Sequence, residues 1–205
     1  MPDLRAVNVR TYSITRPDQL AALASPVRQE IVDVLAGMPR APIAAVAAAL
    51  GRPANGLYYH VRELVRVGLV LPVGGGRGRG QALYRTVARE LAIAYDPSSS
   101  INVARVSAAV GSMLRLGARD FRRGFSRAGV AVSGPRRELW AGRATGWLTA
   151  SEVARANRLI KQIYRLFQGS RFGPRGQLFG VTILLVPLER RPRRRSKERI
   201  HAERR

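Results

Sequence analysis

The feature that most constrains this chain is a break between two short helical patterns, the Gly-Arg-Pro at residues 51–53. Before the break, residues 43–50 form an alanine-rich run whose small side chains allow close packing. After it, helical spacing continues over residues 54–67, and proline suits a first helical turn because its missing N–H would be unpaired there anyway. A hairpin rich in glycine and arginine follows at residues 69–87. This order of helix, turn, helix and basic hairpin predicts a winged helix-turn-helix.

The helix expected over residues 54–67 has one apolar and one polar face. Its apolar positions recur at three- and four-residue spacing and so share one side: Leu57, Val61, Leu64 and Val65. The opposite side carries groups that hydrogen-bond, stack or pair with phosphate: Asn55, Tyr58, Tyr59, Arg62 and Arg66. In a helix-turn-helix the start of this helix enters the major groove, where Asn pairs with adenine and Arg with guanine. The alternative is a polar face that is only solvated.

The hairpin predicts a wing, with strands over residues 69–71 and 82–87 and a tip that reads VGGGRGRGQ. Glycine lets a tip approach a phosphate backbone closely. We therefore expect Arg77, Arg79 and Gln81 to contact the DNA backbone or a narrow minor groove. Glycine-rich loops also cradle nucleotide phosphates, but such loops join a strand to a helix. This loop joins two strands, which argues against a nucleotide site.

Several motifs within residues 15–90 resemble the ArsR-type winged helix of bacterial transcriptional regulators. They are Ala24-Ser25-Pro26-Val27-Arg28 opening a helix, Tyr59-His60 in the second helix, and Gly68-Leu69-Val70 entering the wing. The resemblance implies a homodimeric, sequence-specific DNA-binding regulator, and we expect a repressor. It also implies which positions face DNA: Arg52, Ala54, Asn55, Tyr58, Tyr59 and Arg62. His60 matches a recurrent family position, and its role stays open between phosphate and core.

The chain departs from the metal-sensing members of that family, which bind through thiolates or clusters of histidine and carboxylate. It has no cysteine, and its two histidines, His60 and His201, are far apart in sequence. Arsenite sensing is excluded because no thiolate is present to bind the metal. We expect no metal and no cofactor. The lack of cysteine also rules out disulfides.

The net charge of +23 is unevenly distributed. Residues 1–90 contain 12 arginines and 6 acidic residues, a net charge of +6, and residues 91–205 carry +17. This charge favours an anionic partner, which we expect to be double-stranded DNA. The basic tail over residues 189–205 is expected to be disordered, and it either solubilises the chain or clamps phosphates. The alternative function is a general or architectural nucleic-acid-binding protein driven by the basic C-terminal part.

A signal peptide and a membrane span are not expected. The N-terminal ten residues hold charges and a proline where a signal peptide needs an apolar core. The longest apolar run, near residues 178–188, is much shorter than the ~20 residues of a spanning helix. We expect a cytoplasmic, nucleoid-associated protein with no membrane partner.

A second module is predicted over residues 100–188, after a polar boundary at residues 96–100. Its long helix, residues 101–128, carries an apolar stripe: Val103, Val106, Val110, Met113 or Leu114, Gly117, Phe121 and Phe125. The stripe packs either within its own chain or against a second subunit, and we favour the dimer. Strands over residues 138–148 and 178–187, with a helix begun by a capping box at Thr149–Glu152, would complete a small α+β module.

Four aromatic residues of this module either form its core or line a pocket for an unidentified small-molecule effector: Trp140, Trp147, Tyr164 and Phe167. The module has no cysteine, no histidine and few carboxylates, so we expect no enzyme. The predicted fold class is α+β and mostly helical. The predicted domains are a winged helix-turn-helix over residues 1–95, a dimerisation or effector module over residues 100–188, and the tail over residues 189–205.

Overall fold

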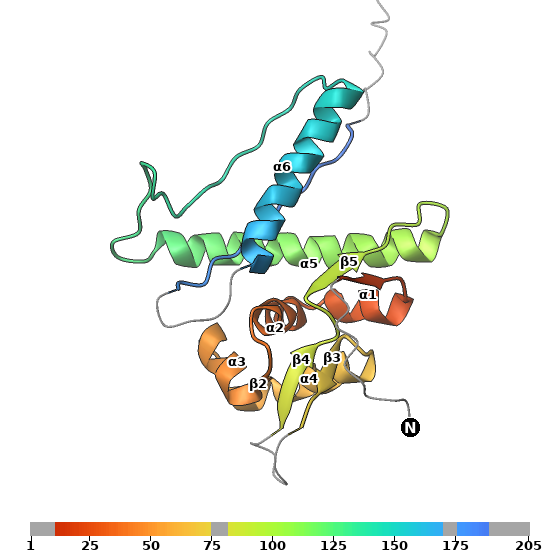
Figure 1. Cartoon of the computed structure of the whole chain (residues 1–205), viewed down its shortest axis with the longest axis vertical. Coiled ribbons are helices and arrows are strands. Elements are labelled where there is room, and N and C mark those ends of the chain that lie inside the picture. The colour runs from red at the N-terminus through yellow and green to blue at the C-terminus, as the bar shows by residue number, and fades with distance from the viewer. Residues whose placement is uncertain (1–10, 75–81, 170–175, 189–205) are drawn as a thin grey trace, which may run out of the picture.

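The computed structural model describes residues 11–74, 82–169 and 176–188. Within these residues the chain is α+β and mostly helical, which confirms the predicted fold class (Figure 1). The wing tip with Arg77, Arg79 and Gln81, and the basic tail over residues 189–205, lie outside the described residues. The division into domains stays a prediction.

The N-terminal half holds the helix-turn-helix. Its helices, in chain order, are α1 (Pro17–Leu23), α2 (Pro26–Ala36), α3 (Ile43–Leu50), the short 3-10 helix η1 (Ala54–Gly56) and α4 (Tyr58–Arg66). Proline opens α1 and α2, where the missing N–H costs no hydrogen bond. Helix α3 has the bounds expected from the alanine-rich run, whereas α4 begins later and ends earlier than expected.

The helix predicted over residues 54–67 is divided, because η1 precedes α4. Asn55 and Gly56 are poor helix formers directly after Pro53, which favours a short tight turn before the α-helix. The turn before η1 is fixed by Gly51, whose φ of 60° is left-handed. The N–H of Arg52 donates to the Ala47 carbonyl at 2.9 Å, so α3 ends in a Schellman motif.

Two small sheets flank these helices. The predicted hairpin is confirmed by β3 (Val70–Pro72) and β4 (Leu83–Thr86), which pair antiparallel with Val70 opposite Thr86. The two-residue strand β2 (Ala41–Pro42) pairs with the other edge of β4. In the second sheet, β1 (Thr11–Ile14) runs parallel to β5 (Glu90–Ile93), a strand that the sequence did not predict. This pairing joins the N-terminal arm to the segment that leads into the long helix.

One apolar core holds this half together. Its fully buried side chains come from α1, α2, α4 and the connections on either side of α4: Leu20, Ile31, Leu35, Leu57, Leu64 and Leu69. Two residues of the next helix, Val106 and Ala109, belong to the same core. The helix-turn-helix is therefore packed against the long helix and does not stand apart from it.

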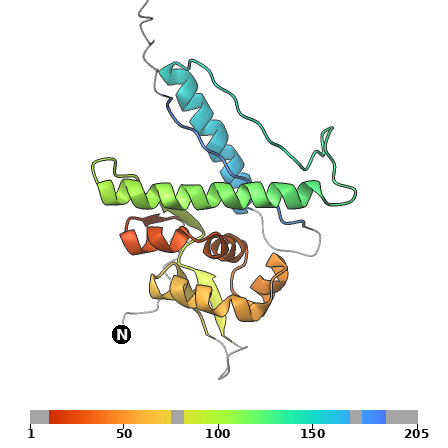
Figure 2. The same cartoon turned by 180° about the vertical axis from the view of Figure 1, so that it is seen from behind.

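The long helix α5 (Ser100–Phe125) begins at a serine cap, since Ser99 Oγ accepts from the Asn102 N–H at 3.2 Å. Its buried positions face α1 and α2: Val106, Ala109, Ser112 and Leu116. The predicted apolar stripe is divided between two environments. Val106 and Val110 pack on the core of their own chain, whereas Val103, Leu114, Phe121 and Phe125 are exposed. Figure 2 shows α5 as a bar across the top of the helix-turn-helix.

The predicted C-terminal strands are wrong. The described residues 138–148 and 178–187 are extended but contain no strand, because no second segment hydrogen-bonds to them in a ladder. Residues 134–137 form a turn, in which the N–H of Arg137 donates to the Gly134 carbonyl at 3.1 Å. The expected small α+β module is thus a single helix flanked by extended chain.

That helix, α6 (Ala150–Gly169), begins with the predicted capping box. The N–H of Thr149 donates to Glu152 Oε2 at 2.7 Å, and the N–H of Glu152 donates to Thr149 Oγ1 at 3.3 Å. None of the described residues of α6 is buried, so the apolar side of this helix is largely uncovered. Figures 1 and 2 show α6 projecting away from α5 on the side opposite the helix-turn-helix. No described helix has the length and apolarity required to cross a membrane.

Candidate nucleic-acid interface

The second helix of the helix-turn-helix presents an exposed polar row formed by Asn55, Tyr59 and Arg62. These residues are spaced by four and three positions, so they lie on one side of η1 and α4. Tyr58 differs from the expectation, because it is half-buried and packs against the core. The described part of the outward face is therefore narrower than the sequence predicted.

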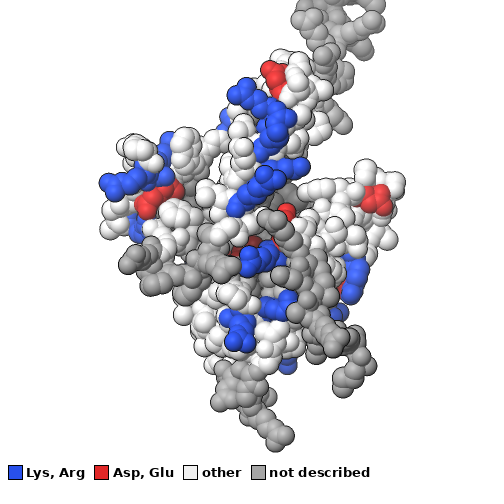
Figure 3. Space-filling model, viewed as in Figure 1, with Lys and Arg blue, Asp and Glu red and all other residues white. Residues whose placement is uncertain are grey.

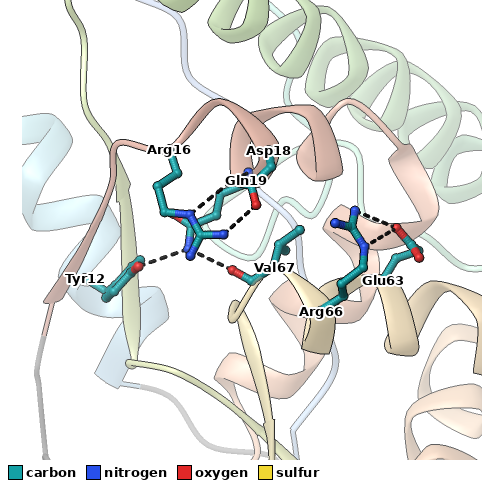
Figure 4. Close-up of polar contacts among 7 residues, drawn as sticks. All are labelled: Tyr12, Arg16, Asp18, Gln19, Glu63, Arg66 and Val67. Atoms are coloured by element: carbon teal, nitrogen blue, oxygen red, sulfur yellow. Dashed lines mark hydrogen bonds and ion pairs between the residues drawn. The ribbon is translucent and has the colours of Figure 1, made fainter.

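Arg66 extends this row by one turn but is already paired. Its guanidinium lies 2.9 Å from Glu63 Oε2, and Figure 4 shows the two side chains side by side on α4. The hydrogen bond from Arg66 lowers the pKa of Glu63 below its usual range, so the pair remains ionised. Exposed pairs of this kind contribute little to stability, but the pairing offsets the charge that Arg66 offers to a phosphate.

His60 lies at the border between α4 and the core. It is half-buried, and its Nδ1 is buried with no hydrogen-bond partner among the described residues. Burial lowers the pKa of His60 below its ordinary value of 6.5, and the nearby charges of Arg28 and Arg52 lower it further. The imidazole is therefore uncharged at neutral pH and is not a cationic phosphate contact in this state.

Arg52 is held inside the protein. Its Nη2 lies 2.7 Å from Oε2 of Glu30, a residue of α2 whose side chain is only 9% exposed. The same carboxylate accepts a hydrogen bond from Arg119 of α5 through Oε1. Arg52 is therefore paired with a buried carboxylate, whereas Asn55, Tyr59 and Arg62 are exposed, although the resemblance grouped all four as facing DNA.

A polar contact that was not predicted from the sequence holds the end of α4. Gln19 of α1 is buried, and its Nε2 donates to the Val67 carbonyl and to the Tyr12 hydroxyl, both at 2.9 Å (Figure 4). This side chain fixes the last turn of α4 against α1 and β1. A glutamine one position before a core leucine in a short amphipathic helix is the only sequence signal for it.

The described part of the wing is a regular hairpin up to its tip. The N–H of Val73 donates to the Leu83 carbonyl, and the N–H of Leu83 donates to the Gly74 carbonyl, both at 2.8 Å. These bonds extend the β3–β4 ladder to the edge of the described residues. The ladder brings the chain to the base of the tip that contains Arg77, Arg79 and Gln81, whose contact with DNA stays a prediction.

Cationic side chains also gather on α6. Figure 3 shows a row of Lys and Arg along the projecting helix, with few acidic side chains beside it. The row is formed by residues at spacings of three, three and four: Arg155, Arg158, Lys161 and Arg165. This row lies on the other side of α5 from the helix-turn-helix, so it is separate from the polar row of Asn55, Tyr59 and Arg62.

The four aromatic residues proposed for an effector site lie in the C-terminal half. Trp140 and Trp147 are 76% and 84% exposed on the extended segment, and Arg137 stacks on Trp140 with 4.1 Å from its guanidinium carbon to the ring centroid. Tyr164 and Phe167 lie on α6, and burial raises the pKa of Tyr164. An effector pocket lined by these residues stays a prediction. Among the described residues no group of three histidine, cysteine or carboxylate side chains could hold a metal ion.

The match to one family model agrees with this architecture. A family model described as a helix-turn-helix domain matches residues 23–73, from the end of α1 to the end of β3. A comparison with curated proteins finds no match. Among solved structures, the chain is similar to the multiple antibiotic-resistance repressor (MarR) from Listeria monocytogenes 4b F2365, at 16% identity over 74% of this chain and 81% of that chain. The TM-score of 0.27 is too low for that likeness to bear on function. The chain thus contains a helix-turn-helix domain, and the narrower ArsR-type resemblance stays an expectation.

Proposed function

We propose that the protein is a cytoplasmic, sequence-specific transcription regulator of the repressor type that binds double-stranded DNA as a homodimer. The observation that carries the proposal is the exposed row of Asn55, Tyr59 and Arg62 on the second helix of the helix-turn-helix. These side chain types form hydrogen bonds with base edges or phosphates, or stack on them. The start of α4 would enter the major groove, and the wing would contact the backbone or minor groove.

The homodimer is supported by apolar side chains that the single chain leaves uncovered. On α5 these are Val103, Leu114, Phe121 and Phe125, and on α6 they include Val153, Leu159 and Ile163. The four residues of α5 share one side of the helix by their spacing, and a contiguous exposed apolar stripe is typical of an interaction site. A two-fold dimer would also present two reading helices to two-fold related half-sites. Sedimentation equilibrium over a wide concentration range tests this, and a monomer at all concentrations would contradict it.

The first experiment is selection of bound fragments from genomic DNA of the source organism at about physiological salt. The full chain is compared with a variant that lacks residues 190–205. The regulator proposal expects a two-fold related motif that is still enriched without the tail. A specific-to-non-specific affinity ratio of ~10³ or more is typical of a sequence reader.

The second experiment asks whether the exposed row reads bases. Asn55→Ala and Arg62→Ala should each reduce discrimination at one base position by about 1–3 kcal/mol. Arg66→Ala is the matched control, because Arg66 lies on the same helix but is paired with Glu63. Equal losses on all DNA sequences would mean that Asn55 and Arg62 contact phosphate only.

The alternative function is a general or architectural nucleic-acid-binding protein. It is favoured by the net charge of +17 over residues 91–205 and by the cationic row on α6. Binding driven by charge alone falls steeply with salt and shows no preferred sequence. No enriched motif, together with loss of binding after removal of residues 190–205, would favour this alternative over the regulator.

A further inference from the structure

A buried ion-pair cluster connects the long helix to the helix-turn-helix. At its centre is Glu30 of α2, with Arg52 on one carboxylate oxygen and Arg119 on the other. The Arg52 and Arg119 side chains are 28% and 22% exposed, and Arg119 also lies 2.7 Å from Asp120. A carboxylate this deeply buried is costly unless it is paired, so Glu30 holds both guanidiniums in defined positions.

Arg52 occupies a sensitive place in the chain. It lies in the turn between α3 and η1, three residues before Asn55. Its backbone is fixed by the hydrogen bond to the Ala47 carbonyl, and the rigid ring of Pro53 follows it. The Arg52 backbone is therefore bonded to α3, and the Arg52 guanidinium is bonded to Glu30. Because of these two attachments, a displacement of Glu30 would shift the turn that positions Asn55.

We propose that Glu30 couples α5 to the DNA-facing turn. Arg119 transmits a movement of α5 to Glu30. Arg52 is a positioning residue that holds the turn and does not contact phosphate. This inference rests on the proposed function. Arg119 belongs to the helix whose exposed apolar residues would bind a second subunit. A change in the position of α5, on assembly of the dimer or on binding of a ligand, would therefore alter the geometry of the reading helix through one shared carboxylate.

The test is a double-mutant cycle on the full chain with Arg119→Gln, Arg52→Gln and the double variant. Arg115→Gln is the matched control, because Arg115 is an exposed arginine one turn earlier on α5 and its loss removes the same charge. Dissociation constants are measured for a DNA site from the selection and for random-sequence DNA, over a range of salt, with each variant confirmed as folded by circular dichroism.

We expect Arg119→Gln to weaken specific binding by roughly threefold to tenfold, and Arg115→Gln to weaken it less than twofold. The double variant should bind about as well as the weaker of the two single variants, because both substitutions break the same connection between α5 and the turn through Glu30. The dependence of binding on salt should be unchanged in Arg52→Gln, since no phosphate contact is lost.

Three results would overturn the proposal. They are equal effects of Arg119→Gln and Arg115→Gln, additive losses in the double variant, and a salt dependence reduced by about one phosphate contact in Arg52→Gln. If wild type prefers no DNA sequence, the proposed function has failed. The urea unfolding midpoints of the same four proteins then test the coupling through Glu30 separately. Non-additive shifts of those midpoints support the coupling, and additive shifts overturn it.

Discussion

The interior glycines of α5 offer a sharp test of how the C-terminal segment lies on that helix. A methyl group added at Gly111 would meet Nη1 of Arg115 at 3.4 Å, the mobile end of a long side chain. At Gly117 it would meet Oγ1 of Thr182 at 3.1 Å and Cβ of the same residue at 3.5 Å. Thr182 belongs to the described segment 176–188, so Gly117 marks the place where this segment crosses α5.

The two substitutions to alanine should therefore differ in sign or size. Replacing glycine by alanine inside a helix gains up to about 1 kcal/mol. Gly111→Ala should keep most of that gain, because the Arg115 guanidinium can move aside. Gly117→Ala should lose it, since overpacking against Thr182 costs ~1–3 kcal/mol. We expect Gly117→Ala to be neutral or destabilising by up to about 2 kcal/mol.

The assay is urea unfolding followed by circular dichroism at one protein concentration for all variants. Thr182→Ala provides the internal control, because it removes the oxygen at 3.1 Å and leaves an ordinary contact at 3.5 Å. In that background Gly117→Ala should become as stabilising as Gly111→Ala. Equal stabilisation by both substitutions in the wild-type background would refute the contact between residues 176–188 and α5.

Three further perturbations test the packing of the helix-turn-helix. Leu64→Ala empties a fully buried position of α4 and should cost about 2–5 kcal/mol in urea unfolding; a loss below about 1 kcal/mol would contradict that burial. Gln19→Ala leaves the buried Val67 carbonyl unpaired and should cost ~1–3 kcal/mol, more than Tyr12→Phe, which removes only one of the two bonds. His60→Gln should flatten the pH dependence of stability. The folded-state pKa of His60 lies below 6.5, so His60 binds more protons in the unfolded chain and its contribution to stability falls as pH falls below about 6.5. Equal changes of the unfolding midpoint between pH 7.5 and 5.5 in wild type and in His60→Gln would contradict this.

The helix-turn-helix could be predicted from sequence because its signals are local and agree with one another. Gly51 and Pro53 end one helix and open the next element, and the Thr149–Glu152 capping box marks the start of α6. The hairpin follows from two short runs of strand-forming residues around a glycine-rich tip. In each case the deciding residues lie close together in the sequence.

The partners of buried polar side chains could not be predicted, because they are distant in sequence. Glu30 pairs with residues 22 and 89 positions away, and Gln19 bonds to a carbonyl 48 positions away. The resemblance to ArsR-type regulators placed Arg52 among the positions that face DNA. Only the packing of α2 and α5 around the turn reveals the carboxylate that holds it.

The two wrong strand predictions and the uncovered surface of α6 have the same physical cause, which is the lack of a neighbouring segment within the described chain. Branched residues at 178–187 favour extended chain, but a strand needs a neighbour for its backbone hydrogen bonds, and the described chain supplies none. Helix α6 has 20 residues, and most of the stability of a helix in a protein comes from packing of its apolar face rather than from helix propensity. Its capping box adds about 1 kcal/mol, which is less than burial of one apolar face would add. An amphipathic helix with no buried residue therefore gains its main stabilisation only when a second surface covers it. Under the proposed homodimer that surface belongs to the partner subunit. The exposed apolar residues of α5 and α6 would then be explained by contacts with that subunit, which the described residues of one chain do not contain.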